Sequence, residues 1–424
     1  MQNAGMEYLN SRLMFGMVPG LESTRKICAA LGNPEKNFRT VHVVGTNGKG
    51  STSFYLSGIL MAHGLRTGLY TSPHLVSLRE RIRVNDETIG ERDLDRLLLR
   101  VKAAAEMVQV EPTFFEVLTA VAFLYYAEQK IDVAVLEAGM GGRLDSTAVA
   151  NGDIIVVTSV GLEHTEILGS TESAILKEKM MVAGESPSES AGKHFILGGL
   201  SQALLEEGKK WACKLDASVT VPEIRRDIVL SNLGQHYVEN ASLSLTTAEI
   251  FLGSRYDDSI AVEILRNRSW AGRMQLLTDE SGRVRVILDG AHNSHAVRRL
   301  VDTLKTYYPG KKFPCLFGAL KDKDVGDMLR LISPCVSDWH ITRTPYPRFR
   351  ELSDLREELE RLNLHVESSG ELTYEYLNHV LDAETPLLVT GSLYMIGLTI
   401  QLLKEDFKGL EFFRELSPST NEHR

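Results

Sequence analysis

The chain has 424 residues, enough for more than one hydrophobic core, and 43% of them are hydrophobic, which is ordinary for a globular protein. Its net charge of −9 gives no electrostatic case for binding nucleic acid. No apolar run approaches the ~20 residues of a membrane span, and the first residues lack the pattern of a signal peptide. The four cysteines are far apart, which indicates neither a disulfide framework nor a zinc site. We therefore expect a cytoplasmic protein with no nucleic acid or membrane among its partners; we also expect a monomer.

Residues 1–38 have a helical pattern interrupted at Gly20, and the first informative stretch, residues 40–52, then reads TVHVVGTNGKGST. A β-branched run predicts a buried strand, and a helical pattern follows the glycines. Glycines let the backbone approach a phosphate, Lys49 can reach terminal phosphates, and a hydroxyl such as that of Ser51 can bind Mg²⁺. Gly50 separates the lysine from the serine, unlike the usual G-x-x-x-x-G-K-[ST] spacing. A glycine-rich turn is the alternative; we favour a phosphate-binding loop because strand, glycines, lysine and hydroxyl agree.

Polar side chains follow three further predicted strands, at residues 67–71, 131–137 and 153–159. They are Ser72, Glu137 and His164. Open α/β sheets bind ligands at the carboxyl ends of their strands, so all three are candidate Mg²⁺ contacts. Each also has a plain structural explanation: a turn serine, a surface acid at a strand end, and a structural histidine.

Several charged or polar segments have two interpretations. Residues 79–83, with three arginines and a glutamate, predict either a solvated surface loop or an anion-binding flap. Helices are predicted at residues 91–110 and 113–129, the second with Thr113 as N-cap and Glu116 as its capping-box partner, a structural role compatible with lining a substrate pocket. The charge run at residues 177–179 predicts a solvated helix face, and Asn240 a helix cap.

A second series of strands and helices begins after a turn at residues 279–282. Strands are predicted at residues 284–288, 313–317 and 386–390, and a helix at residues 354–362. Strands that alternate with helices predict an α/β fold with mostly parallel sheets. We therefore expect two domains, residues 1–278 and residues 279–424.

Taken together and in order, these motifs resemble the folylpolyglutamate synthase/dihydrofolate synthase family of Mur-type ATP-dependent amide ligases. The motifs that carry the resemblance are residues 45–52, 72–74, 137–145, 161–165, 233–236, 270–273, 289–293 and 391–394. The chain departs from the family pattern at Ala148, at Gln275, where the family usually has an acid, and at residues 178–181; residues 184–230 match poorly.

The resemblance implies an N-terminal P-loop ATPase domain and a C-terminal Rossmann-like domain, with the active site between them. It implies ATP and Mg²⁺ as cofactors, and L-glutamate and folate or dihydropteroate as substrates, joined through an acyl phosphate. The implied ATP contacts are Gly48, Lys49, Gly50, Ser51, Asn240, Arg273 and Asp289. The implied metal ligands are Ser51, Ser72, Glu137, His164 and a carbamylated Lys179. The implied catalytic groups are Lys49, His164 and Lys179, and the implied pterin wall is Thr113, Phe114, Phe115, Glu116, Leu144, Asp145 and Ser146.

Three other interpretations stay open. Another Mur-type amide ligase would use the same loop with a different acceptor, and an ATP-driven switch or binding module would use it without ligation. A dinucleotide oxidoreductase is disfavoured, because Lys49 and the following hydroxyls suit a triphosphate and no G-x-G-x-x-G follows a strand.

Overall fold

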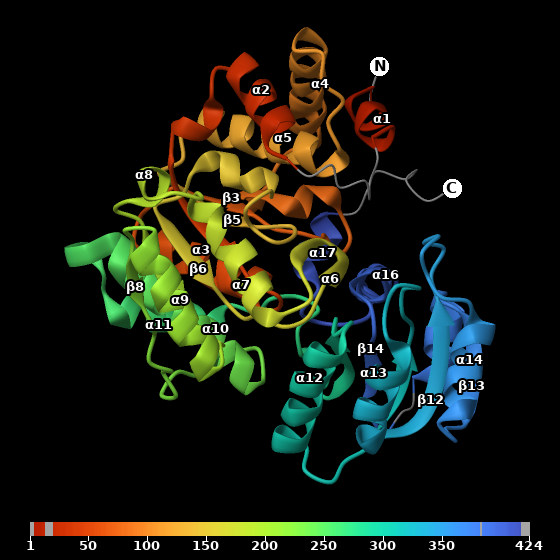
Figure 1. The fold of residues 1–424 in the computed structure, drawn as a ribbon. Coiled ribbons are helices and arrows are strands. Elements are labelled where there is room, and N and C mark those ends of the chain that lie inside the picture. The colour runs from red at the N-terminus through yellow and green to blue at the C-terminus, as the bar shows by residue number, and fades with distance from the viewer. Residues whose placement is uncertain (1–3, 13–19, 382–383, 417–424) are drawn as a thin grey trace. The chain divides into compact units, whose positions relative to one another are not determined.

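The computed structural model describes residues 4–12, 20–381 and 384–416, which form two units (Figure 1). The N-terminal unit comprises Met1–Pro73, Arg79–Leu230 and Tyr237–Arg268. The C-terminal unit comprises His74–Leu78, Ser231–His236 and Ser269–Arg424. We expected the second domain to start at residue 279, but the C-terminal unit already includes β9 (Gln275–Thr278), because this strand pairs with β10 (Val284–Asp289).

An eight-stranded sheet forms the centre of the N-terminal unit, in the order β4-β3-β2-β5-β1-β6-β7-β8. Neighbouring strands from β2 to β8 are parallel, and β3 and β4 are antiparallel additions at one edge. The strands are β1 (Arg39–Val44), β2 (Thr67–Tyr70), β3 (Ile82–Val84), β4 (Glu87–Thr88), β5 (Val133–Glu137), β6 (Ile154–Val157), β7 (His194–Leu197) and β8 (Ser218–Thr220).

The centre of this sheet fixes the position of three loops. β1 lies between β5 and β6, and its register places Val43 opposite Glu137 on one side and Val156 on the other. Val41, Val43 and Val44 are fully buried, which explains why β-branched residues dominate this part of the sequence. Because the three strands are parallel, the loops that follow them all leave the sheet at one edge, the one formed by the carboxyl ends of these strands. We call this the sheet edge.

Helices cover this sheet, and α2, α4 and α5 contact one another as one group (Figure 1). The α-helices are α1 (Ala4–Asn10), α2 (Glu22–Ala30), α3 (Lys49–Ala62), α4 (Glu91–Met107), α5 (Phe114–Glu128), α6 (Thr165–Leu168), α7 (Glu172–Met180), α8 (Pro187–Ser190), α9 (Gln202–Lys214), α10 (Gln235–Leu252) and α11 (Asp258–Asn267). Short 3₁₀ turns are η1 (Pro34–Lys36), η2 (Leu78–Arg81), η3 (Ser146–Ala150), η4 (Met181–Ala183) and η5 (Gly253–Arg255). In the part of the chain that the structure describes, no helix combines the length and apolarity needed to cross a membrane.

The C-terminal unit is built on a six-stranded sheet in the order β13-β12-β11-β14-β10-β9, parallel except for β9. The remaining strands are β11 (Phe313–Phe317), β12 (Val336–Arg343), β13 (Val366–Glu371) and β14 (Leu387–Thr390). Its helices are α12 (Ser294–Tyr307), α13 (Val325–Ile332), α14 (Leu352–Arg361), α15 (Tyr374–Val380), α16 (Leu393–Leu403) and α17 (Glu411–Glu415), with the 3₁₀ turn η6 (Ser333–Cys335). Leu288, Leu316, Val389, Ile396 and Ile400 belong to its core.

The α/β fold class with mostly parallel sheets is confirmed. The buried strands agree with their predicted ranges within one or two residues, and β11 agrees fully. The sequence analysis missed the polar edge strand β13 and the strand β12 beside it. It also missed β3 and β4 where it expected a charged loop. The helical pattern of residues 1–38 corresponds to α1 and α2, whereas residues 13–19 lie outside the described residues.

The predicted capping box at the start of α5 is confirmed: the Glu116 amide donates to Oγ1 of Thr113 at 3.3 Å, and the Thr113 amide donates to Oε2 of Glu116 at 2.7 Å. We predict that Thr113→Ala lowers the free energy of unfolding by about 1 kcal/mol, because one amide of the first turn loses its acceptor. Chemical denaturation followed by circular dichroism measures this loss. Thr113→Ser keeps the hydroxyl and is the control; equal stability of the alanine and serine variants would contradict the prediction.

Candidate active site

The predicted phosphate loop between β1 and α3 is held by the segment that follows β6. The Thr46 amide donates to the Ser159 carbonyl at 2.9 Å, and the Asn47 amide donates to the Ser159 hydroxyl at 3.0 Å. Lys49 opens α3, and its ammonium group donates to the carbonyls of Gly45 at 2.9 Å and Thr46 at 3.3 Å. The first amides of a helix have no acceptor within the helix, so this loop gathers N–H groups and a cation suited to an anion.

Close neighbours require glycine at two positions of this loop. A Cβ on Gly45 would lie 1.9 Å from the Thr158 hydroxyl. Gly48 has a φ of +89°, and a Cβ there would lie 2.6 Å from Oδ1 of Asn240. The predicted nucleotide contacts Gly48 and Asn240 are therefore neighbours. Asn240 is not the helix cap that we expected, because α10 already begins at Gln235; Asn240 is a buried side chain within that helix.

Ser72 and Glu137, two of the predicted metal ligands, lie side by side at the ends of β2 and β5. The Ser72 amide donates to Oε2 of Glu137 at 2.9 Å, and Glu137 is 4% exposed. Since Glu137 pairs in register with Val43, two residues before Gly45, the carboxylate lies at the sheet edge from which the phosphate loop leaves.

Lys179 is 0% exposed, so the interpretation of residues 177–179 as a solvated charge run is wrong for this lysine. Its Nζ donates to Oε1 of Glu163 at 2.8 Å. Burial lowers the pKa of Lys179 to about 8, with Glu163 raising it and Lys49 lowering it. Burial alone would raise the pKa of Glu163, but Lys49 and Lys179 hold it below its ordinary value. The three charges therefore form one cluster that links α7 to the phosphate loop.

His164 follows Glu163 in the chain and occupies the N-cap position of α6, with an exposed side chain. Its φ of 45° is left-handed, a conformation that a residue with a Cβ adopts at a cost of roughly 1–2 kcal/mol. Because Glu163 bonds to Lys179, the His164 backbone lies beside the charged cluster.

The oxygen donors at this sheet edge fit Mg²⁺. Among the residues that the structure describes, no three His, Cys, Asp or Glu side chains are grouped so as to hold a metal ion by themselves. Mg²⁺ prefers hard oxygen ligands and is usually bound by one or two carboxylates together with substrate phosphates. Glu137 offers a buried carboxylate, and Ser51, 4% exposed in the first turn of α3 after Gly50, offers a hydroxyl.

The predicted pterin wall begins with two aromatic residues at the start of α5. Phe114 is 6% exposed. The Phe115 ring lies 5.8 Å from the Tyr70 ring, and a Cβ on Gly139 would lie 2.8 Å from Cζ of Phe115. The glycine after β5 thus leaves room for an aromatic ring against the backbone, which places the wall next to the strand that ends in Glu137.

Asp145, also predicted for this wall, organises its own loop. Its Oδ1 accepts the amide and hydroxyl of Thr147 at 3.0 and 2.6 Å, and its Oδ2 accepts the Met140 amide at 3.0 Å. Burial raises its pKa, and these hydrogen bonds oppose the rise. Ser146 is buried and Leu144 is half-buried on either side. The loop is held against the lysine as well, because a Cβ on Gly142 would lie 2.5 Å from the Lys179 carbonyl oxygen.

Arg273 and Asp289, the remaining predicted ATP contacts, belong to the C-terminal unit and are neighbours there. Oδ2 of Asp289 accepts the Met274 amide at 2.9 Å, and Nη1 of Arg273 approaches the Gly290 carbonyl at 3.5 Å. The surroundings are cationic: burial, with smaller contributions from Arg299, Arg273 and His295, lowers the pKa of His236 to about 3.

Gln275, where the family pattern has an acid, makes two bonds in the same unit. Its Oε1 accepts the Gly272 amide at 2.9 Å, and its Nε2 donates to the Gly409 carbonyl at 3.0 Å. The side chain therefore uses both its acceptor and its donor.

The sequence analysis did not name two charged residues of this region as site residues, Glu163 and Arg81. Glu163 stands one residue before His164, after a buried strand, and that position was a usable signal. Arg81 was seen only as one member of a charged segment, and nothing in the sequence separates it from Arg79 or Arg83.

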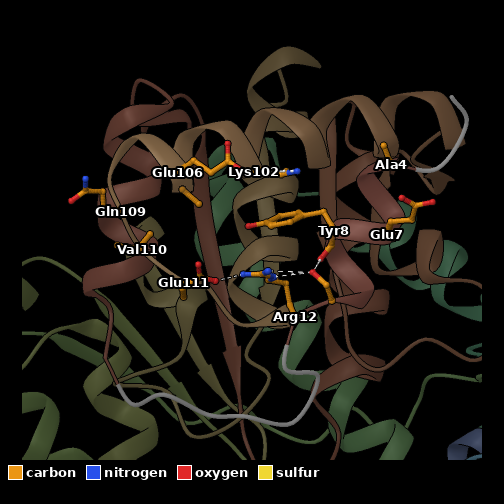
Figure 2. A pocket seen from close by; sticks show the side chains of 11 residues that line it. Ala4, Glu7, Tyr8, Arg12, Lys102, Glu106, Gln109, Val110 and Glu111 are labelled. Atoms are coloured by element: carbon orange, nitrogen blue, oxygen red, sulfur yellow. Dashed lines mark hydrogen bonds and ion pairs between the residues drawn. The ribbon is translucent and has the colours of Figure 1, made fainter.

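A hollow of about 570 Å³ lies elsewhere in the N-terminal unit, between α1 and the C-terminal part of α4 (Figure 2). Figure 2 shows Arg12 reaching toward Glu111, with which it forms an ion pair. The Tyr8 ring contacts two cations: the guanidinium of Arg12, 4.8 Å from its centroid, and Nζ of Lys102, at 5.8 Å. No predicted site residue lines this hollow, so we assign the candidate site to the sheet edge instead.

The chain is similar to several known proteins in sequence and in fold. A family model described as Mur ligase, glutamate ligase domain, matches residues 272–393. A dihydrofolate synthase/folylpolyglutamate synthase of Bacillus subtilis (strain 168) is 31% identical, over 92% of this chain and 96% of that protein. The structure of E. coli FolC in complex with DHPP and ADP superposes with a TM-score of 0.81 and 26% identity, over 94% of this chain and 97% of that one. The structure of a bifunctional folylpolyglutamate synthase/dihydrofolate synthase from Yersinia pestis, complexed with AMPPNP and Mn ion, superposes with a TM-score of 0.80 and 26% identity, over 95% of this chain and 98% of that one.

The contact between Gly48 and Asn240 yields a prediction for nucleotide binding. Gly48→Ala would push its Cβ against Oδ1 of Asn240 and strain the loop backbone, so we expect the affinity for ATP to fall at least ~10-fold. Isothermal titration with an unreactive ATP analogue measures this change.

Gly64→Ala is the matched control. Gly64 follows the same helix at a φ of +81°, and a Cβ there would meet nothing within 4 Å. It therefore carries the backbone strain without the collision. Equal nucleotide affinities of the two variants would show that the contact with Asn240 has no role in binding.

Proposed function

The chain belongs to the dihydrofolate synthase/folylpolyglutamate synthase family, and from that premise we propose that it joins L-glutamate to the carboxylate of a folate or of dihydropteroate at the expense of ATP. The family predicted from the sequence is thereby confirmed. The observation that carries the proposal is the gathering of Lys49, Glu137 and Lys179 at one sheet edge. These residues are far apart in the chain, and a site for phosphoryl transfer to a carboxylate needs their charges together.

The reaction needs an activated acceptor, because a carboxylate loses oxide too poorly to acylate an amine. The γ-phosphoryl group of ATP passes to a carboxylate oxygen, and ADP leaves. The amino group of glutamate then attacks the acyl carbon, the carbon–oxygen bond to phosphate breaks with its electron pair going to phosphate, and the amine loses a proton. No nucleophilic side chain takes part, and alignment and charge stabilisation are what the protein supplies.

We assign the nucleotide contacts to the loop and its neighbours. Lys49 would stabilise the charge on the transferring phosphoryl group, and Asn240 would border the nucleotide beside Gly48. Gly50 and Ser51 would present their amides from the first turn of α3. Arg273 and Asp289 are the proposed ATP contacts of the C-terminal unit, where the cationic surroundings of Arg273 suit an anion.

The metal is assigned to the donors at the same sheet edge: Ser51, Ser72, Glu137, His164 and Lys179. When bound, Mg²⁺ supplies neutralisation of phosphate charge and alignment of the γ-phosphoryl group. Glu137 is held by the Ser72 amide, so its carboxylate is oriented in advance.

We further propose that Lys179 carries a carbamate in the working enzyme. Addition of CO₂ to its neutral amine, with loss of one proton, would convert a buried cation into a carboxylate able to bind metal. Its full burial and its contact with Glu163 support this assignment. With a pKa of about 8, its neutral share near pH 7.5 exceeds that of an ordinary lysine by roughly two orders of magnitude.

The aromatic wall is assigned to the pterin end of the acceptor. Phe114 and Phe115 offer flat apolar surface, Thr113 and Glu116 fix the start of their helix, and the loop of Leu144, Asp145 and Ser146 would close the wall. A monomeric state, a cytoplasmic location and the absence of nucleic-acid partners stay predictions from the sequence analysis.

Glutamate-dependent release of phosphate from ATP tests the function. With dihydropteroate or tetrahydrofolate as acceptor, we expect phosphate release and a product one glutamate heavier by mass spectrometry. Lys49→Ala should lower the rate ~10²–10³-fold, as expected for loss of a group that stabilises transferring charge. Lys209→Ala removes an exposed lysine of α9 and is the control. Phosphate release without a glutamylated product would favour a non-ligating ATPase, and substantial turnover by Lys49→Ala would contradict the role of this lysine.

The carbamate has its own test. We expect protein equilibrated with ¹³C-bicarbonate to show a carbamate carbon signal by NMR that is absent from Lys179→Gln, and we expect this variant to lose ligation. Lys177→Gln, an exposed lysine of the same helix, should keep both the signal and the activity. A wild-type rate in Lys179→Gln would refute the assignment.

A further inference from the structure

The charged segment at residues 79–83 is not the solvated loop that its composition allows. Glu80, Arg81 and Arg83 are only 5%, 9% and 6% exposed. Arg79 and Arg83 hold the local backbone. Arg79 donates from Nε to the Ile89 carbonyl at 2.6 Å, and Arg83 donates from Nε to the Glu80 carbonyl at 3.0 Å.

Arg81 differs from them in its position. Its carbonyl accepts the Thr71 amide at 3.1 Å, so it is fixed opposite the end of β2. The next residue after Thr71 is Ser72, whose amide bonds to Glu137. Arg81 is therefore placed by backbone pairing at the sheet edge that carries the proposed metal and phosphate groups.

The guanidinium of Arg81 also lies on the proposed pterin wall. It is 5.6 Å from the centroid of the Phe114 ring. Tyr70, whose ring packs on Phe115, has its pKa raised by burial; Arg81 opposes this rise, and Asp145 and Glu137 add to it. One buried cation is therefore next to the aromatic wall and near the carboxylates of the site.

We propose that Arg81 binds the carboxylate of the acceptor and holds it for phosphorylation, while the aromatic wall holds the ring system. This inference rests on the proposed function and adds to it a residue that selects an aromatic acid. A guanidinium is planar, weakly hydrated and able to bond both oxygens of a carboxylate. The interaction between the two groups is stronger in a buried site than in water. Lysine or glutamine could not reproduce that two-point contact.

The test pairs a change in the protein with a change in the ligand. The probes are pteroate and its carboxamide, which has the same rings without the charge, titrated into the full chain with AMPPNP and Mg²⁺. We expect the native protein to bind the carboxylate about 10- to 100-fold more tightly than the carboxamide. Arg81→Gln should bind the two equally, and its affinity for AMPPNP should be unchanged.

Arg79→Gln is the matched control, because it removes an arginine two positions away whose bonds include those to Ile89, Thr88 and Glu91. It should keep the preference for the carboxylate. Arg81→Lys keeps the charge and loses the planar fork, so we expect it to prefer the carboxylate over the carboxamide less strongly than the native protein does. This variant replaces Arg81→Gln in the test if the glutamine variant does not fold.

The outcomes separate this inference from the function on which it rests. A native protein that ligates glutamate while Arg81→Gln keeps the full preference would overturn the role of Arg81 alone. The role also fails if Arg81→Lys prefers the carboxylate as strongly as the native protein does. A native protein that neither binds pteroate nor releases phosphate with any pterin acceptor would overturn both proposals.

Discussion

The position of β1 between two parallel partners is the constraint on which the candidate site depends. Parallel pairing makes the loops after β1, β5 and β6 leave the sheet at one edge, and the register sets Glu137 opposite Val43. The phosphate loop is then fastened sideways to the strand-end segment by Ser159. A residue of any one loop therefore has its position set by the whole sheet rather than by its own sequence neighbours.

Charge is the second organising principle, and it works because the site is buried. Lys179 is buried, so its ammonium form is costly and depends on Glu163. Lys49 and Lys179 in turn lower the pKa of Glu163, which favours its ionised form. A site of this kind is sensitive to any added negative charge, such as a triphosphate or a carbamate, because each one changes the balance among groups with little water between them.

The sequence predicted the parts of the molecule whose physics is local. Apolar runs, several of them rich in β-branched residues, identified the buried strands, and glycines followed by a lysine identified the phosphate loop. The capping box was readable from the spacing of Thr113 and Glu116. These features depend on residues within a few positions of each other, which is the range that a single sequence reports well.

What the sequence could not give depends on packing between distant segments. Asn240 looked like a cap because its role comes from Gly48, nearly two hundred residues earlier. Lys179 looked solvated because a charge run contains no sign of burial. The polar edge strand β13 lacks the apolar alternation that marks a strand, and Arg81 is distinguished from its neighbours only by pairing across β2.

The bonds of Gln275 explain one departure from the family pattern. An amide side chain has an acceptor oxygen and a donor NH₂ group, and here the oxygen bonds to Gly272 and the NH₂ group to Gly409. An ionised acid at this position would keep the first bond and face the Gly409 carbonyl with a like partial charge. A change of the side chain at 275 therefore requires a change in the path of the backbone near 409. We expect a relative with an acid at this position to have a different backbone path in its C-terminal segment.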